Sequence, residues 1–472
     1  MIRRKAFNLV KDYGGMLSPF LLVAGILIMV LLPTLASQRV TIHENAIGDV
    51  NPEFFISKRI ASTALSEAPW SQRLVRSGRS PGTDRVVVYV NTAYSVSMRL
   101  SNILIEHLVF QKDLSCDVQF YFVNDSMKWP IPEGYIRAAL VLNISSSHHK
   151  VCIDLYSKHG IRPNQDLPSI AILYSGAESL EVSLMCQSGR SLESSHHSPL
   201  MYFMKSLEES MLVDNHPQPW HPISTRGISI IALSSNPLQA SSDADDVVEG
   251  ISAGLLHHSS MLLRMIQSLG RMEERFNHAS WGYLPVSPTH FVSFDLAQLV
   301  LFLFIGSMVS TGYRLHQLHR PFGEGISTPA MAPIAGLVYN AAGLPGVTLI
   351  TLFFAERAGW KSGMGGWIAM NIIGLVLILG LQPSTGFLGG AAVALQLFFL
   401  HPLCFNLLGL VIGVGVSWGV FFYFTWYLGF PIWCTNSISS TFVSVFLYPN
   451  CVWVLSRLLR YLSSKDINNI VY

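Results

Sequence analysis

The sequence predicts a multispan α-helical membrane protein that carries one large α/β domain outside the membrane. Only 13% of the 472 residues are charged, against about 25% in an ordinary soluble protein. Residues 362–456 contain no Asp, Glu, Lys or Arg, whereas residues 37–290 have ordinary charge density and short apolar runs of strand length. A charge-free surface would aggregate in water, so the charge-free tract must face lipid or other membrane helices. The net charge of +2 gives no electrostatic footprint for nucleic acid.

The first transmembrane helix is predicted at residues 16–36, which contain no charged side chain. At about 1.5 Å per residue, a helix of this length crosses a hydrocarbon core of about 30 Å. Residues 1–15 contain Arg3, Arg4, Lys5 and Lys11. The positive-inside rule therefore places this N-terminus in the cytosol and the following domain on the far side of the membrane. The alternative is a cleaved secretory signal, which the length of the apolar run disfavours.

Residues 37–290 are predicted to form an α/β domain with a mixed or parallel sheet flanked by helices. Its strand-length runs are apolar at successive positions, which is typical of strands covered on both faces. A helical pattern at residues 96–110 lies between the first two runs, with the spacing of a βαβ crossover. The domain is long enough to build its own core. The predicted strands are residues 86–90, 118–123, 139–144, 151–155 and 228–233.

A long amphipathic helix is predicted at residues 244–278, near the end of this domain. Apolar residues recur there at alternating spacings of three and four, and His258 interrupts the stripe. Such a helix either packs on the sheet or also binds a partner protein. The stripe consists of Val248, Ile251, Leu255, Leu262, Met265, Leu269, Met272 and Phe276.

About six further spans are predicted within residues 291–456, followed by a C-terminal tail at residues 457–472. Seven spans in total would leave the tail on the far side of the membrane, whereas its basic residues favour the cytosol. Either residues 329–361 contain an additional re-entrant or paired segment, or one span is miscounted. The predicted segments are residues 294–313, 329–355, 366–381, 386–400, 405–428 and 437–455.

The α/β domain offers few candidates for catalysis or for metal binding. His148-His149 and His196-His197 are adjacent pairs, whose side chains do not share one face of a helix or strand. Neither pair has a cysteine or carboxylate at a metal-ligand spacing. Zinc-peptidase, nucleophile-elbow, phosphate-loop and dithiol motifs do not occur in the sequence. We therefore expect no catalytic residue, no metal and no cofactor in this domain.

Whether glycans and disulfides form depends on the cellular compartment that contains the domain. If it is lumenal, the sequons at Asn124 and Asn143 can accept glycans, although Asn143 lies inside a predicted strand, where it is harder to reach. The domain contains Cys116, Cys152 and Cys186. Their odd number leaves at least one free or paired with a partner protein.

Four short motifs carry a family resemblance, and they follow one another in that family's order. His43-Glu-Asn-Ala-Ile-Gly48 follows the first span, and Thr225-Arg-Gly-Ile228 begins the last predicted strand. Gly282-Tyr-Leu-Pro285 precedes the second span, and Leu447-Tyr-Pro449 lies in the last one. In these motifs and in membrane architecture, the chain resembles the anchor-attachment subunit of the glycosylphosphatidylinositol (GPI) transamidase over nearly its whole length. Each motif alone is weak, and together they are fairly specific.

The resemblance implies a lumenal domain of the zinc-aminopeptidase fold in a multi-pass protein of the endoplasmic reticulum membrane. Active enzymes of that fold hold two metals with a His-x-Asp after an early strand, a bridging Asp and a Glu-Glu pair. Here the predicted strands are followed by Asn91-Thr92 and by Asn124-Asp125, and Asn143 stands at a further ligand position. A two-metal hydrolase needs several convergent carboxylates and imidazoles. We therefore expect a noncatalytic subunit.

The resemblance also implies the partners of the chain. They are a caspase-like cysteine protease subunit, which cleaves and transfers, other transamidase subunits and the GPI lipid. Tyr448 and Pro449 are the predicted GPI-binding residues, because a proline in a span frees a backbone carbonyl and the tyrosine adds a hydroxyl. A simple kink beside an interfacial aromatic residue is the alternative explanation.

Two rival functions come from other classes. One is a membrane-tethered metallopeptidase or an amide-forming synthetase with an altered site. The other is a transporter. Buried ionisable residues normally mark transport pathways. Between Lys361 and Arg457 the chain offers only His401, which disfavours ion-coupled transport.

Overall fold

The computed structural model of the chain divides into two units. The α/β unit comprises Pro33–Phe294, and the helical unit comprises Met1–Leu32 together with Asp295–Tyr472. The structure describes residues 2–36, 71–75, 84–110, 116–125, 128–146, 149–184, 198–235, 247–248, 251–272, 283–319, 371–372, 374–378, 381–399, 407–430, 437–448, 450–451 and 454.

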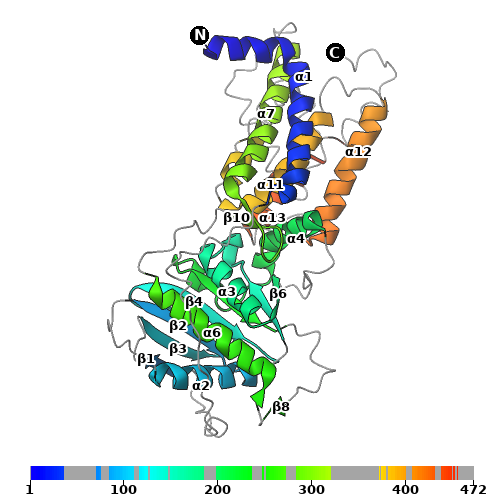
Figure 1. Ribbon diagram of the computed structural model, residues 1–472. Helices are drawn as coiled ribbons and strands as arrows, with labels where there is room; N and C mark the ends of the chain where they lie inside the picture. The colour runs from blue at the N-terminus through cyan, green and yellow to red at the C-terminus, as the bar shows by residue number, and fades with distance from the viewer. Residues whose placement is uncertain are drawn as a thin grey trace. The chain divides into compact units, whose positions relative to one another are not determined.

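A mixed sheet of seven strands forms the centre of the α/β unit (Figure 1). The strands are β1 (Ser71–Val75), β2 (Arg85–Asn91), β3 (Asp117–Val123), β4 (Ile136–Asn143), β5 (Lys150–Asp154), β6 (Glu181–Leu184) and β7 (Ile230–Ser234). Their order across the sheet is β1-β3-β2-β4-β7-β5-β6. The pairs β2-β3, β2-β4, β4-β7 and β5-β6 are parallel, whereas β1-β3 and β5-β7 are antiparallel. The predicted mixed sheet is confirmed, and all five predicted strands belong to it.

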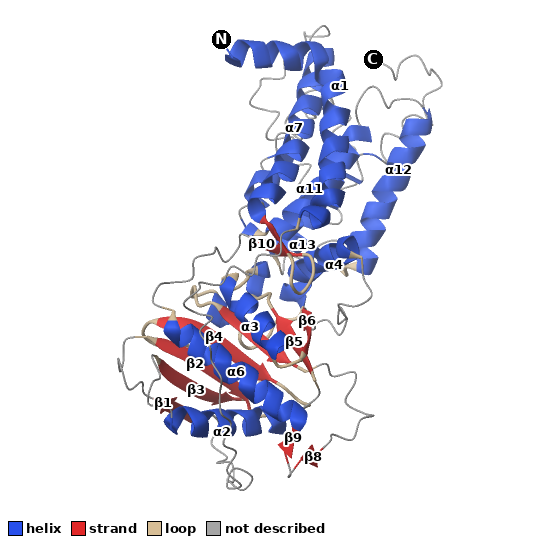
Figure 2. Cartoon of the chain, in the orientation of Figure 1, coloured by secondary structure: helices blue, strands red, loops and turns tan. Residues whose placement is uncertain are grey.

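Helices and loops cover both faces of the sheet. Val86 and Val88 of β2 point into one core, whereas Val87 and Tyr89 point into the other. Trp220 is buried in the second core. Burial on both faces explains why the strands are apolar at successive positions. Figure 2 shows that three helices lie over the first face: α2 (Ser95–Phe110), α3 (Asp166–Ala177) and α6 (Ala253–Arg271).

The amphipathic helix α6 is shorter than predicted. It begins at Ala253 rather than at residue 244, because Val247–Val248 (β8) and Ile251–Ser252 (β9) pair as an antiparallel ribbon. Branched Val and Ile side chains favour strand conformations. Its apolar face is buried in the first core, as expected for a helix packed on the sheet. His258 is tolerated there because its Nδ1 donates to the Gly254 carbonyl at 2.7 Å, and burial lowers its pKa.

The remaining described elements of the α/β unit lie outside the seven-stranded sheet. They are the 3-10 turns η4 (Lys158–Gly160) and η5 (Val213–Asn215), helices α4 (Pro199–Leu212) and α5 (His221–Ser224), and the paired strands β10 (Tyr283–Pro285) and β11 (Phe291–Ser293).

Several described helices of the helical unit overlap segments that were predicted as spans. Its described elements are α1 (Ile2–Leu31), α7 (Phe294–His319), α11 (Pro383–Phe399), α12 (Leu407–Phe422), the π-helical turn η9 (Tyr423–Tyr427), α13 (Ile438–Phe442) and the π-helical turn η10 (Val443–Leu447). The 3-10 turn η1 (Leu32–Leu35) follows α1 along the chain and lies mostly in the α/β unit. The predicted span at residues 329–355 and the C-terminal tail lie outside the described residues.

Among the described helices, one is long and apolar enough to cross a membrane, at Leu17–Leu35. Two shorter apolar helical stretches are Gln298–Thr311 and Val411–Tyr427. Near the N-terminus, a membrane anchor and a signal sequence satisfy the same length and composition test. The number of spans therefore stays a prediction.

The helical unit buries polar side chains and exposes apolar ones. Phe20 of α1 is 69% exposed, Phe302 of α7 is 64% exposed and Trp426 of η9 is 86% exposed. By contrast, Ser18 and Gln382 are fully buried. Apolar side chains such as Phe304 and Phe387 are also fully buried, so this unit has apolar side chains both inside and on its surface.

Candidate functional site

The carboxyl ends of the parallel strands meet at one edge of the sheet. β2 is followed along the chain by β3 on one side and then by β4 on the other. The order of the strands therefore reverses between β2 and β4, which is where α/β sheets usually bind ligands. Asn91 ends β2 and Asn143 ends β4. Asp125 follows the end of β3 at the same edge.

Asn91 draws these side chains together. Its Nδ2 donates to both carboxylate oxygens of Asp125, at 2.9 and 3.0 Å, and lies 3.2 Å from Oδ1 of Asn143. Its Oδ1 accepts from the Ala93 N–H at 3.0 Å. Asn91 is fully buried, whereas Asp125 is exposed. The amide nitrogen thus occupies the point where three oxygen atoms converge, as a bound cation would.

Strand order marks this edge of the sheet as a candidate ligand site, but its side chains offer few ligands to a metal ion. Within the described ranges, no group of three His, Cys, Asp or Glu side chains is placed to hold a metal ion. Asp125 and Asn143 supply oxygen ligands, but the Asn91 amide already fills the space between them. Asn91 was not among the predicted site residues. Its position at the end of the first central strand is the signal that could have identified it.

Of the two predicted histidine pairs, only His149 lies among the described residues. His149 is exposed, and its ring lies 5.1 Å from that of His257 on α6, centroid to centroid. His148, His196 and His197 lie outside the described residues.

The two predicted glycosylation sites differ in environment. Asn124 is exposed in the loop after β3, and its backbone carbonyl accepts from Nε1 of Trp129 at 3.2 Å. Asn143 is half-buried at the end of β4, with its side-chain oxygen bound to Asn91. Glycosylation at either residue stays a prediction.

The cysteines of the α/β unit also differ from one another. Cys152 on β5 is disulfide-bonded. Cys116 is a free, buried thiol, and burial raises its pKa to about 12. Cys186 lies outside the described residues. A thiol with so high a pKa is protonated at neutral pH and is a poor nucleophile.

Tyr448 occupies a defined place in the helical unit. It is 3% exposed, and its hydroxyl donates to the Phe430 carbonyl at 2.9 Å. The same hydroxyl lies 2.9 Å from Oγ1 of Thr425 in the π-helical turn η9, and the Tyr448 ring packs against Phe421 at 5.2 Å. Tyr448 follows η10 directly, so it joins the two π-helical turns. Pro449 lies outside the described residues.

The hydrogen bonds of Tyr448 change what it can contribute to lipid binding. Its hydroxyl has two partners within the chain, so it positions backbone rather than offering an unpaired donor. Thr425 and Phe430 were not among the predicted residues, because their contacts with Tyr448 depend on tertiary packing. The assignment of Tyr448 and Pro449 to GPI binding stays a prediction.

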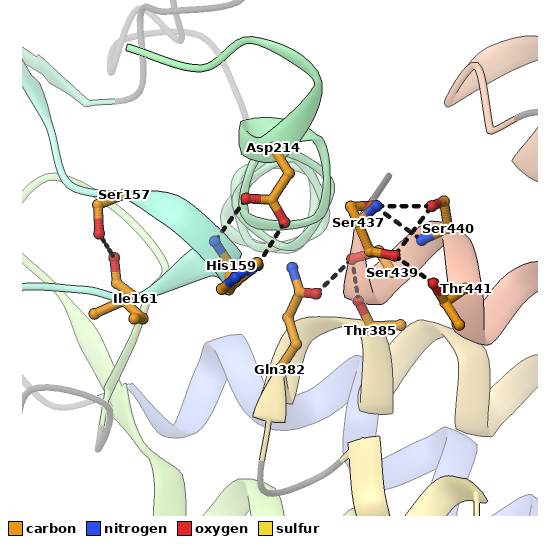
Figure 3. Close-up of polar contacts among 10 residues, drawn as sticks. All are labelled: Ser157, His159, Ile161, Asp214, Gln382, Thr385, Ser437, Ser439, Ser440 and Thr441. Atoms are coloured by element: carbon orange, nitrogen blue, oxygen red, sulfur yellow. Dashed lines mark hydrogen bonds and ion pairs between the residues drawn. The ribbon is translucent and has the colours of Figure 1, made fainter. Parts of the chain in front are cut away.

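A second set of polar contacts joins α11 to α13 inside the helical unit. The Ser439 hydroxyl lies between Gln382 and Thr385, donating to Oε1 of Gln382 at 2.6 Å and lying 2.8 Å from Oγ1 of Thr385 (Figure 3). Ser437 and Ser440 form a reciprocal cap at the start of α13. These side chains are buried. Interhelical hydrogen bonds of this kind hold together helices that are surrounded by lipid.

Figure 3 also shows a polar contact of the α/β unit, which involves a residue with a strained backbone conformation. His159 has a φ of 62°, a conformation that residues other than glycine seldom adopt. The Asp214 carboxylate accepts two hydrogen bonds from His159: one from the backbone N–H at 2.6 Å and one from Nδ1 at 3.1 Å. This pair joins η4 to η5. The Ser157 hydroxyl, two residues before His159, donates to the Ile161 carbonyl at 3.1 Å.

The chain was also compared with known proteins. No protein-family model matches it, and no curated protein matches it.

Proposed function

We propose that this chain is a noncatalytic subunit of the GPI transamidase in the endoplasmic reticulum membrane. It helps to assemble the complex and presents the GPI lipid for attachment to protein C-termini. The proposal rests on the four ordered sequence motifs. The observation that carries its noncatalytic part is the sheet edge, where the Asn91 amide occupies the point between the Asp125 and Asn143 oxygens.

The surface of the helical unit supports a multispan membrane location. Its helices direct large apolar side chains outward on α1, α7 and α12. In water these side chains would have to be covered, whereas in a bilayer they contact acyl chains at little cost. Serine, threonine, asparagine and glutamine side chains are buried between the helices. These residues replace the hydrophobic effect as the source of specificity between helices in lipid.

Contacts between α1 and α7 support retention of the N-terminal helix as an anchor. The Ser18 hydroxyl lies 3.3 Å from that of Ser307 and 2.5 Å from that of Thr311. The Ser307 hydroxyl donates to the Ser18 carbonyl at 2.9 Å. A Cβ added to Gly25 would come within 2.8 Å of the Phe304 ring, so the two helices approach closely. A cleaved signal peptide would forfeit all of these contacts.

The disulfide at Cys152 supports a lumenal location for the α/β unit. Disulfides persist in the secretory pathway and are rare in the reducing cytosol. The exposed sequon at Asn124 is compatible with the same compartment. With the lumen on one side, the basic residues of the N-terminus would remain cytosolic.

The lipid-binding part of the proposal concerns the region around Tyr448 and Pro449. π-helical turns leave backbone carbonyls outside the regular ladder, and they recur at functional sites. Two such turns meet at Tyr448. We expect that Pro449→Leu leaves the complex assembled and reduces the amount of GPI that co-purifies with it. Unchanged GPI recovery from an intact complex would remove Pro449 from the lipid site.

Affinity purification of the full-length chain from mild detergent tests the proposal as a whole. Mass spectrometry of the eluate should identify a caspase-like cysteine protease, further transamidase subunits and GPI. Recovery of the chain without any cysteine protease, under conditions that preserve other membrane complexes, would contradict the assignment.

The rival proposal is a metal-dependent peptidase or amide-forming synthetase, and one observation favours it. Asp125 is exposed at the point of the sheet where enzymes of α/β architecture bind substrates. Metal analysis of the purified chain separates the two proposals. Stoichiometric zinc, together with loss of transamidation in Asp125→Asn, would favour the enzyme.

A further inference from the structure

A buried arginine lies between the α/β sheet and the terminal hairpin of the α/β unit. Arg162 is 2% exposed, in the segment that connects η4 to α3. Its Nη1 donates to the backbone carbonyl of Tyr283 on β10. The guanidinium lies 5.9 Å from the ring centroid of Tyr156 and 5.5 Å from that of Tyr283. Two aromatic faces and one carbonyl therefore hold the cation in place.

One edge of this guanidinium is incompletely paired. Nη1 is used by the hairpin, and Nε has no hydrogen-bond partner. Nε and Nη2 together form the edge with which arginine binds planar oxyanions through two parallel hydrogen bonds. A buried donor without an acceptor costs free energy. An acceptor at this edge would remove that cost.

A second unpaired polar group belongs to the same cluster. Tyr202 on α4 is 3% exposed, and its hydroxyl has no hydrogen-bond partner. It lies one helical turn from Ser206, whose hydroxyl is 2.6 Å from that of Tyr156. The Tyr202 hydroxyl lies close enough to Tyr156 for their charges to interact, and Tyr156 packs beside Arg162, which brings Tyr202 into the same cluster.

We propose that Arg162 and Tyr202 form a carboxylate-binding site beneath the β10-β11 hairpin. The site is independent of the proposed transamidase role and is assigned from these two unpaired groups alone. A carboxylate matches the single guanidinium charge and accepts two parallel hydrogen bonds from its Nε–Nη2 edge. A phosphate dianion would leave excess negative charge close to Asp166, whose charge already acts on Tyr283. The site therefore favours a monoanion.

Formate is the smallest probe of this site, and formamide is its neutral counterpart of similar shape. The melting temperature of the full-length chain in detergent is measured against increasing sodium formate, formamide, phosphate or chloride at constant ionic strength. We expect formate alone to raise the melting temperature. In Tyr202→Phe the affinity for formate should fall about tenfold, as expected for one lost hydrogen bond to a charged group. Arg162→Met should abolish the response.

Two conservative variants distinguish a loss of formate binding from a loss of folding. Tyr202→Phe removes a hydroxyl that has no partner, so the unliganded protein should melt at the wild-type temperature or slightly above it. Tyr89→Phe is the matched control, because its hydroxyl donates to the Pro130 carbonyl in the other core, and its formate affinity should equal that of the wild type. Equal shifts with formate and formamide, a response to phosphate instead of formate, or wild-type affinity in Tyr202→Phe would each overturn the proposal.

Discussion

Asn91 shows how one side chain decides what a sheet edge can do. Its amide donates to the Asp125 carboxylate and to the Asn143 oxygen, so these groups stabilise the loops after β2, β3 and β4. An aspartate of the same shape would instead place two carboxylates about 3 Å apart and leave the Asn143 oxygen unpaired. The chemistry of this sheet edge therefore depends on the side chain of Asn91 being an amide and not a carboxylate.

Asn91→Asp should lower the stability of the chain by about 2 kcal/mol at neutral pH, through lost charge-assisted hydrogen bonds and like-charge repulsion. Manganese should restore part of this loss, since two carboxylates and an amide oxygen are suitable ligands for it. Thermal melting with and without manganese measures both effects. Asn124→Asp, an exposed neighbour with the same charge change, is the control. Equal behaviour of the two variants would contradict the role given to Asn91.

Exposure separates the two sequons. Asn124 is exposed, whereas Asn143 is half-buried at the end of a central strand and bound to Asn91. If the unit is lumenal, Asn124→Gln should remove one glycan from the chain, and Asn143→Gln should leave its glycosylation unchanged. Gel mobility before and after glycosidase treatment measures this. Loss of a glycan in Asn143→Gln alone would show that the edge of the sheet opens before the domain folds.

His221 makes the stability of the α/β unit depend on pH. Burial lowers its pKa from 6.5 to about 4, and its Nδ1 accepts from the Gln218 N–H at 3.2 Å. Between pH 6.5 and 4 the unfolded chain binds a proton at this residue and the folded chain does not. Stability therefore falls as the pH drops through that window, by up to about 3 kcal/mol. His221→Asn, which keeps an acceptor, should show a shallower fall in melting temperature over this range, and an unchanged slope would contradict the assignment.

At the scale of elements, the contact between α1 and α7 depends on small residues. Gly25 faces the buried Phe304 ring, which an added Cβ would approach to 2.8 Å. Gly25→Ala should therefore destabilise the helical unit by about 1 to 3 kcal/mol through overpacking. Gly415→Ala on α12 is the control, since its added Cβ would meet open space and alanine favours helix. Equal melting temperatures for both variants in detergent would argue against a packed α1-α7 contact.

The elements differ in how far the sequence predicts them. Buried strands such as β2 and the crossover helix α2 follow from continuous apolar runs and helical spacing. Helix α3 has no apolar stripe to detect, because it is buried on most sides. The edge strands β1 and β6 are short and partly polar, so their pairing depends on tertiary context. The early start predicted for α6 overlooked the strand preference of Val247, Val248 and Ile251.

The candidate sites also differ in how far the sequence predicts them. The meeting of Asn91, Asp125 and Asn143 could be predicted from strand order, because the carboxyl ends of parallel strands share one edge. The contacts of Arg162 with Tyr283 and of Tyr448 with Phe430 could not. The first joins residues more than a hundred positions apart, and the second depends on two π-helical turns that no sequence pattern indicates.

At the scale of the whole molecule, the two units have different chemistry. One has ordinary charge density, a mixed sheet and a disulfide. The described helices of the other expose large apolar side chains and bury polar groups beside apolar ones. The proposal that the chain is a noncatalytic transamidase subunit assigns the first unit the role of a lumenal scaffold and the second that of a lipid-facing bundle.

The most direct test of this account is complementation in cells from which the chain has been removed. GPI-anchored proteins at the cell surface are counted by flow cytometry after return of wild-type chain or Asp125→Asn. We predict that removal abolishes surface GPI-anchored proteins and that both forms restore them, because Asp125 supports the sheet edge and takes no part in bond cleavage. Normal surface levels without the chain would contradict the transamidase assignment. Rescue by the wild type but not by Asp125→Asn, at equal expression, would contradict the noncatalytic role.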